Sequence, residues 1–156
     1  MVLGVSGSGK STVGEALAGA LGWPFADADD FHPATNVAKM RAGIPLTDAD
    51  RAPWLATLRE LMAQALAGGH SLVLACSALK QAYRDRLQVD ARVRFVYLRG
   101  DRDLIAARIA ARTGHYMPPG LLQSQFDALE EPDDALWVEV DQPPEAIVGE
   151  ILDALA

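Results

Sequence analysis

The chain has 156 residues, of which half are apolar and 22% are charged, the length and balance of a single globular domain with its own core. Its net charge of −7 argues against non-specific nucleic-acid binding, and no apolar run approaches the length of a membrane span. The only cysteine is Cys76, so no intrachain disulfide can form and we expect a cytoplasmic protein.

A glycine-rich stretch near the start dominates the sequence. It reads Gly4-Val5-Ser6-Gly7-Ser8-Gly9-Lys10-Ser11 and fits G-x-x-x-x-G-K-[ST], the pattern of a phosphate-binding P-loop. An expected strand, residues 2–5, leads into it, and an expected helix, residues 10–21, follows it. The glycines let successive N–H groups turn toward an anion, and the helix N-terminus adds the positive end of its dipole. Lys10 would then reach the β- and γ-phosphates of a nucleotide, and the Ser11 hydroxyl would bind Mg²⁺.

Strands and helices alternate along the rest of the chain. We expect further strands at 24–26, 71–75, 93–98 and 136–140, and helices at 33–41, 54–66, 78–87, 101–112, 121–129 and 144–155. This alternation predicts an α/β fold in which helices cover both faces of a parallel sheet, with ligands at the carboxyl ends of the strands.

The sequence also predicts where the long helix starts, which tryptophans are buried and how far the first strand extends. Residues 47–50 have the form of a capping box, yet Pro53 favours a later start of the long helix, because proline is poorly tolerated inside one. Trp54 and Trp137 are expected in the core. The first strand has only three residues before the P-loop, so we expect the natural start to lie a few residues upstream.

Two aspartates follow the second expected strand. Asp27 and Asp29 are two residues apart, which on an extended segment turns both carboxylates the same way. Beside a P-loop, one would hold Mg²⁺ or its waters while the other accepts a proton from an acceptor hydroxyl, and the pattern does not say which. The alternative is an acidic turn in which Asp30 caps a helix.

Positive charge is concentrated in one part of the chain, since nine of the fourteen Lys and Arg residues fall between positions 80 and 112. Lys80 and Arg84 are four residues apart on one helix face and would clamp an anionic acceptor. Arg108 and Arg112 have the same spacing and precede a Gly/Pro-rich segment, 113–120, that is typical of a mobile lid. A solvated basic face and an ordinary surface loop are the plainer interpretations.

Several other polar residues are ambiguous from spacing alone. Arg51 lies at a helix start, where it opposes the helix dipole, so it serves either a ligand or a salt bridge to Asp48 or Asp50. For His32, a structural role is the simpler hypothesis than an acceptor contact, and Asn36 and Lys39 are equally ambiguous.

The chain resembles the bacterial gluconokinases over nearly its whole length. The matching stretches are G-V-S-G-S-G-K-S (4–11), D-x-D-x-x-H-P-x-x-N-x-x-K-M (27–40), P-L-x-D-x-D-R-x-P-W-L (45–55), C-S-A-L-K-x-x-Y-R-D (76–85), Q-F-x-x-L-x-E-P (125–132) and D-Q-P (141–143). The resemblance implies a nucleoside-monophosphate-kinase-like P-loop fold of three α/β/α layers, with a five-stranded parallel sheet and a lid at about 112–120. It also implies a homodimer that uses MgATP to phosphorylate the 6-hydroxyl of D-gluconate.

The resemblance also implies a role for each candidate residue. Lys10, Asp29 and Arg112 would be catalytic, with Asp29 as the base or the acceptor anchor, and Mg²⁺ would bind Ser11 and Asp27. ATP would contact the loop from Gly4 to Ser11, together with Thr12, Arg108, Asp141, Gln142 and Pro143. Gluconate would contact Asp29, His32, Arg51, Ser77, Lys80, Arg84 and Gln125.

Other functions remain to be separated by experiment. A kinase of the same fold could act on shikimate, a nucleoside monophosphate or another sugar acid. A regulatory module would bind ATP without turnover, and a P-loop hydrolase would release ADP without any acceptor. The shared presence of Lys10, Ser11, Asp27 and Asp29 favours a kinase.

Overall fold

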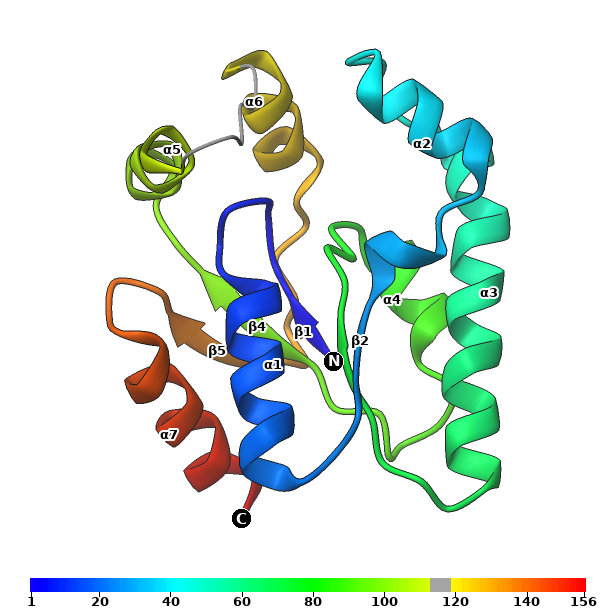
Figure 1. Ribbon diagram of the computed structural model, residues 1–156, viewed down its shortest axis with the longest axis vertical. Coiled ribbons are helices and arrows are strands. Elements are labelled where there is room, and N and C mark those ends of the chain that lie inside the picture. The colour runs from blue at the N-terminus through cyan, green and yellow to red at the C-terminus, as the bar shows by residue number, and fades with distance from the viewer. Residues whose placement is uncertain (113–118) are drawn as a thin grey trace.

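The computed structural model describes residues 1–112 and 119–156, and a five-stranded sheet lies at its centre (Figure 1). All the strand pairs are parallel, and the strand order is β2-β3-β1-β4-β5. The strands are β1 (Val2–Leu3), β2 (Phe25–Asp27), β3 (Val73–Ala75), β4 (Val96–Arg99) and β5 (Leu136–Glu139). The predicted parallel α/β fold is confirmed, although every strand except β2 is shorter than its predicted range.

Helices cover the sheet on both faces, which gives the three expected layers. The helices are α1 (Lys10–Leu21), the 3-10 turn η1 (Ala28–Phe31), α2 (Ala34–Arg41), α3 (Asp48–Ala67), α4 (Gln81–Leu87), α5 (Arg102–Ala111), α6 (Pro119–Ala128) and α7 (Pro144–Leu155). Among the described residues, no helix is both long enough and apolar enough to cross a bilayer.

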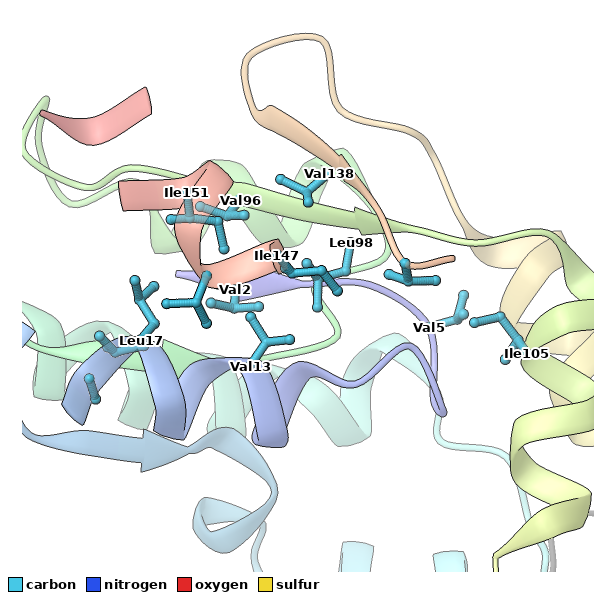
Figure 2. Close-up of a cluster of buried hydrophobic side chains, with 14 of the residues drawn as sticks. Val2, Val5, Val13, Leu17, Val96, Leu98, Ile105, Val138, Ile147 and Ile151 are labelled. Atoms are coloured by element: carbon cyan, nitrogen blue, oxygen red, sulfur yellow. The ribbon is translucent and has the colours of Figure 1, made fainter. Parts of the chain in front are cut away.

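Two buried clusters join these layers. On one face, α1 and α7 direct Val13, Leu17, Ile147 and Ile151 toward the central strands (Figure 2). On the other face, α3 and α4 cover the sheet with a second set, Trp54, Leu55, Leu58, Met62, Tyr83 and Leu87. Because the helices that follow β1 and β3 lie on opposite faces, a crevice opens between the carboxyl ends of these two strands.

The long helix α3 begins earlier than Pro53 suggested. Thr47 Oγ1 accepts a hydrogen bond from the Asp50 N–H at 3.1 Å, and Asp50 Oδ2 accepts one from the Thr47 N–H at 2.9 Å. This capping box stabilises a first turn at Asp48, so the expectation of a start at Pro53 was wrong. Pro53 lies in the second turn, where it removes one backbone hydrogen bond without ending the helix.

The two tryptophans expected in the core differ. Trp54 is 3% exposed and its indole N–H donates to the Ala28 carbonyl at 2.7 Å. Trp137 is 42% exposed, so that expectation was wrong. It lies on the edge strand β5, where its ring packs at an interplanar angle of 84° against Tyr97 and part of it meets solvent.

Candidate active site

A cavity of about 690 Å³ opens at the carboxyl end of the sheet, where ligands were predicted to gather. Its floor is the P-loop together with the ends of β2 and β3. Its walls come from the segment between α2 and α3, from α4, and from α5 and α6. In Figure 1, α2 and α6 stand on either side above this end of the sheet. A volume of this size accommodates either a whole nucleotide, or a small acceptor together with the reacting part of a nucleotide.

The P-loop has the conformation that phosphate binding requires. Gly7 and Gly9 have φ values of 80° and 94°, and α1 begins directly after Gly9 with no side-chain cap. A Cβ at Gly7 would also lie 2.7 Å from Ile109, so the loop packs too closely there for any larger residue. Within the described part of the chain, the N–H groups of Gly7, Gly9, Lys10 and Ser11 have no acceptor. Such a set of N–H groups at a helix N-terminus is an anion site.

Lys10 is placed to serve the same anion. Its Nζ donates to the Val5 carbonyl at 3.0 Å, which folds the side chain back across the loop into the cavity. Burial lowers the pKa of Lys10, and the nearby Asp29 carboxylate opposes that effect. An anionic phosphate would provide further compensation for this buried charge.

Ser11 and Asp27 lie together beside the loop. The Ser11 hydroxyl donates to Asp27 Oδ2 at 2.6 Å, and the other carboxylate oxygen accepts from the Asp29 N–H at 3.0 Å. A hydroxyl and a carboxylate next to a phosphate site are the hard oxygen ligands that Mg²⁺ takes, so these residues fit that ion. Among the described residues, no group of three or more His, Cys, Asp or Glu side chains could hold a metal.

Asp29 was expected on an extended segment, and that local geometry was wrong. The strand ends at Asp27, and Asp29 lies in the 3-10 turn η1, which the sequence analysis missed. Both residues still line the cavity. Burial, followed by repulsion from Asp27, raises the pKa of Asp29, and Lys10 counteracts this. A carboxylate in this environment is a stronger proton acceptor than one in water.

The wall opposite the P-loop is basic and is organised around Tyr83. Lys80 Nζ lies 3.1 Å from Asp48 Oδ1, and the Tyr83 hydroxyl donates to the same carboxylate. Arg51 Nη1 donates to the Tyr83 oxygen at 3.2 Å and to the Leu46 carbonyl at 2.9 Å. Arg51, Lys80 and Tyr83 all line the cavity, where Lys80 is already ion-paired with Asp48.

Of the two alternatives for Arg51, neither expected salt bridge forms. Among the described residues, Arg51 donates only to an uncharged hydroxyl and a carbonyl, so no carboxylate there neutralises its charge and a ligand can pair with it. Asp50 instead pairs with Lys39, at 2.8 Å. Tyr83 was missed by the sequence analysis, although it stands inside the quoted C-S-A-L-K-x-x-Y stretch.

His32 lies on the same wall and packs flat against Trp54. The two rings are 4.3 Å apart at an angle of 13°, and His32 Nδ1 is 3.2 Å from the Asn36 side-chain nitrogen. Both rings line the cavity, so Trp54 is at once a core residue and part of the site.

Gln125 reaches the P-loop from α6. Its Oε1 accepts from the Ser6 N–H at 2.7 Å, and its Nε2 lies 2.9 Å from the Ser6 hydroxyl. Gln125 and Ser6 both line the cavity, as do Ser77 and Arg112. The loop is therefore held from a segment 119 residues away in the sequence.

Other predicted residues are not brought to the cavity wall. Arg84 is 1% exposed, and its guanidinium donates to the carbonyls of Ala78, Leu79 and Glu130 and to the Gln81 side chain. These four contacts tie α4 to the segment after α6, so Arg84 has a structural role. Of the predicted pair Lys80 and Arg84, only Lys80 lines the cavity.

The residues expected near adenine lie at the same edge of the sheet but outside this cavity. Arg108 donates to the Val140 carbonyl, and Gln142 donates to the Glu139 carbonyl at 2.9 Å and to Glu150 at 3.0 Å. Asp141 and Pro143 flank Gln142 at the start of α7. The lid was predicted at 112–120, and its residues 113–118 lie outside the described residues.

Comparison with known proteins agrees with this geometry. The sequence profile of the shikimate kinase family matches residues 6–156. The gluconokinase of Gluconobacter oxydans (strain 621H) is 44% identical over 97% of this chain and 88% of that protein. The probable gluconokinase of Mus musculus is 45% identical over 99% of this chain and 96% of its own length.

Solved structures give the same picture. A gluconokinase from Sinorhizobium meliloti 1021 superposes with a TM-score of 0.89 at 49% identity, covering 99% of this chain and 89% of that one. A shikimate kinase from Aquifex aeolicus vf5 shares the fold, with a TM-score of 0.55 at 21% identity over 99% of this chain and 93% of its own.

Proposed function

This chain belongs to the gluconokinases within the shikimate kinase family of P-loop kinases, and we propose that it transfers the γ-phosphoryl group of ATP to the 6-hydroxyl of D-gluconate. The products are 6-phospho-D-gluconate and ADP. The observation that carries the proposal is that one cavity joins a P-loop to a second wall bearing Arg51 and Lys80. That combination suits a reaction between a nucleotide and an anionic acceptor.

On the nucleotide side, the chain's own groups hold and neutralise phosphate. The free N–H groups of the P-loop and the Lys10 ammonium would bind the β- and γ-phosphates, with Ser11 and Asp27 holding Mg²⁺. When bound, the ion withdraws charge from the phosphate oxygens. Thr12 and Arg112 also line the cavity, and Arg112 would face the transferred group. Adenine would extend toward Arg108 and the segment of Asp141, Gln142 and Pro143.

On the acceptor side, the cavity offers cations for the carboxylate of gluconate and uncharged polar groups for its hydroxyls. Arg51 and Lys80 would bind the carboxylate of gluconate, while His32 and Ser77 would bind hydroxyl groups along its chain. Asp29 would accept the proton of the 6-hydroxyl while the oxygen of that hydroxyl attacks the γ-phosphorus. The bond between the γ-phosphorus and the oxygen that bridges it to the β-phosphate breaks in the same step. The raised pKa of Asp29 supports its choice over Asp27, whose two oxygens are already occupied by Ser11 and a backbone N–H.

Three further parts of the proposal rest mainly on the family. We propose ATP and Mg²⁺ as the cofactors, a homodimer as the assembly and the cytoplasm as the location. A free thiol such as the buried Cys76 is compatible with a reducing compartment, and sedimentation of the purified protein would test the dimer.

The test is ADP release with MgATP and a panel of acceptors. We expect D-gluconate to stimulate release strongly, while shikimate and a nucleoside monophosphate leave it at the background rate. Stimulation by shikimate instead would keep the kinase class and overturn the acceptor. Release that is equal with and without any acceptor would indicate a hydrolase.

A further inference from the structure

The orientation of the Asn36 side chain is fixed by its surroundings. Asn36 is 2% exposed, and its Nδ2 lies 2.9 Å from the Asp50 carbonyl oxygen and 3.2 Å from His32 Nδ1. A carbonyl oxygen can only accept a hydrogen bond, so the amide must present its NH₂ group, and not its oxygen, to Asp50. The second hydrogen of that NH₂ group is then the one shared with His32.

This arrangement determines where the proton of His32 resides. Since Asn36 donates, Nδ1 must accept and therefore carries no hydrogen, which leaves the ring proton on Nε2. An imidazolium would set an N–H of the ring against an N–H of the amide. Burial lowers the pKa of His32, as does Arg51, while Asp29 raises it, so the balance of neighbours also favours the neutral ring.

Asp50, which accepts the hydrogen bond from Asn36, is itself held by several hydrogen bonds. Asp50 belongs to the capping box of α3, and both of its carboxylate oxygens accept from Lys39 on α2, at 3.0 and 2.8 Å. Trp54 holds the face of the imidazole by stacking. The residues that were ambiguous in the sequence, His32, Asn36 and Lys39, thus form one connected group with Asp50.

We propose that Asn36 is a positioning residue that fixes His32 as the neutral tautomer with its proton on Nε2, and that His32 donates this hydrogen to a hydroxyl oxygen of the acceptor. The inference rests on the proposed function. His32 and Asp29 both line the cavity and are close enough to affect each other's charge, so a donor and an acceptor are available to the same ligand. A sugar-acid hydroxyl both donates and accepts hydrogen bonds, so it can accept one from His32 and donate one to Asp29. A neutral donor also leaves the charge of Asp29 intact for proton transfer.

The tautomer can be read directly, without any activity, in the ¹⁵N-labelled wild-type protein. Long-range ¹H–¹⁵N spectra at neutral pH should show His32 with a pyrrole-like Nε2 and a pyridine-like Nδ1. Loss of these signals in His32→Gln assigns them, and the exposed His70 serves as the internal reference. A protonated Nδ1 in wild-type His32, as imidazolium or as the other tautomer, would overturn the proposal.

Kinetics then test what the tautomer does. In His32→Gln the side-chain NH₂ takes the approximate place of Nε2–H, whereas in His32→Asn it takes that of Nδ1, and both variants lose the stacked ring. We expect KM for gluconate to rise about tenfold more in His32→Asn than in His32→Gln, with KM for ATP unchanged in both. Equal effects of the two variants would refute a donor at Nε2.

Asn36→Asp reverses the polarity of the partner, because a carboxylate accepts from Nδ1. At a pH that keeps the imidazole neutral, we expect the His32 proton to move to Nδ1 and KM for gluconate to rise at least tenfold at constant KM for ATP. Thr35→Asp places the same charge on the exposed side of α2 and should match wild type. A wild-type KM for gluconate in Asn36→Asp would refute the positioning role. If wild-type protein shows the Nε2–H tautomer but gluconate does not stimulate its ADP release, the proposed acceptor is refuted and the proposed tautomer is not.

Discussion

Replacing Gln125 with alanine tests whether α6 holds the P-loop in its binding conformation. The side chain makes two neutral hydrogen bonds to Ser6, one to the backbone N–H at 2.7 Å and one to the hydroxyl at 2.9 Å. A neutral hydrogen bond contributes about 1 kcal/mol net, so the pair amounts to about 2 kcal/mol. If all of this energy orders the loop for ATP, its loss corresponds to roughly 30-fold weaker ATP binding, at about 1.4 kcal/mol per tenfold change.

The assay is ADP release at saturating gluconate with ATP varied, supported by calorimetric titration of ATP. Gln123→Ala is the matched control, because Gln123 is on the same helix and, among the described residues, its side chain donates a hydrogen bond only to Asp127, at 2.7 Å. We expect a rise in KM for ATP in Gln125→Ala and none in Gln123→Ala. If Gln125 contacts gluconate instead, KM for gluconate will rise while KM for ATP stays constant. Identical KM values for ATP in the two variants would refute the loop-ordering role.

Three other substitutions probe separate parts of the account. Asp29→Asn should lower kcat by about 10²-fold or more while leaving the Kd for ATP near wild type, because it removes the proposed base and not a phosphate ligand, and near-normal turnover would exclude that role. Arg84→Met should leave three carbonyls without their charged donor and lower the free energy of unfolding by about 3 kcal/mol, a fall of roughly 6–12 °C in melting temperature. KM for gluconate should not change. A raised KM for gluconate at an unchanged melting temperature would make Arg84 a ligand residue. Hydrogen bonds from Lys39 and from the Thr47 backbone hold the pKa of Asp50 at about 2 in the folded state, so its stabilising effect is complete above the unfolded pKa of about 4 and is lost as the pH falls toward 2. Denaturant titrations should therefore show wild type and Asp50→Asn converging in stability over that pH range, and a constant difference would contradict the linkage.

The sequence predicted best those features that depend on local chemistry. The bounds of α1 and α7 match their expected ranges, since Gly22 ends one helix in a left-handed conformation and Pro144 begins the other. The P-loop pattern also located the cavity, because residues at the carboxyl ends of parallel strands must converge. Pro53 suggested too late a start for α3, because the capping box of Thr47 and Asp50 stabilises an earlier first turn.

The features that the sequence could not predict depend on distant parts of the chain. The partners of Arg84 include a carbonyl 46 residues away, and those of Gln125 are 119 residues away, so no spacing rule identifies them. Trp137 has the composition of a core residue and lies on an edge strand, which only the strand order reveals. The protonation of His32 likewise depends on a carbonyl of α3 acting through Asn36.

The central claim is that phosphate moves from ATP to the 6-hydroxyl of D-gluconate, and the position of phosphate in the product decides it. In a ³¹P spectrum of the completed reaction, transfer to the 6-hydroxyl gives one new phosphomonoester, coupled to both protons of the terminal CH₂ group. We predict that signal in equal amount to the ADP released. A phosphomonoester coupled to a single carbon-bound proton, or inorganic phosphate alone, would contradict the account.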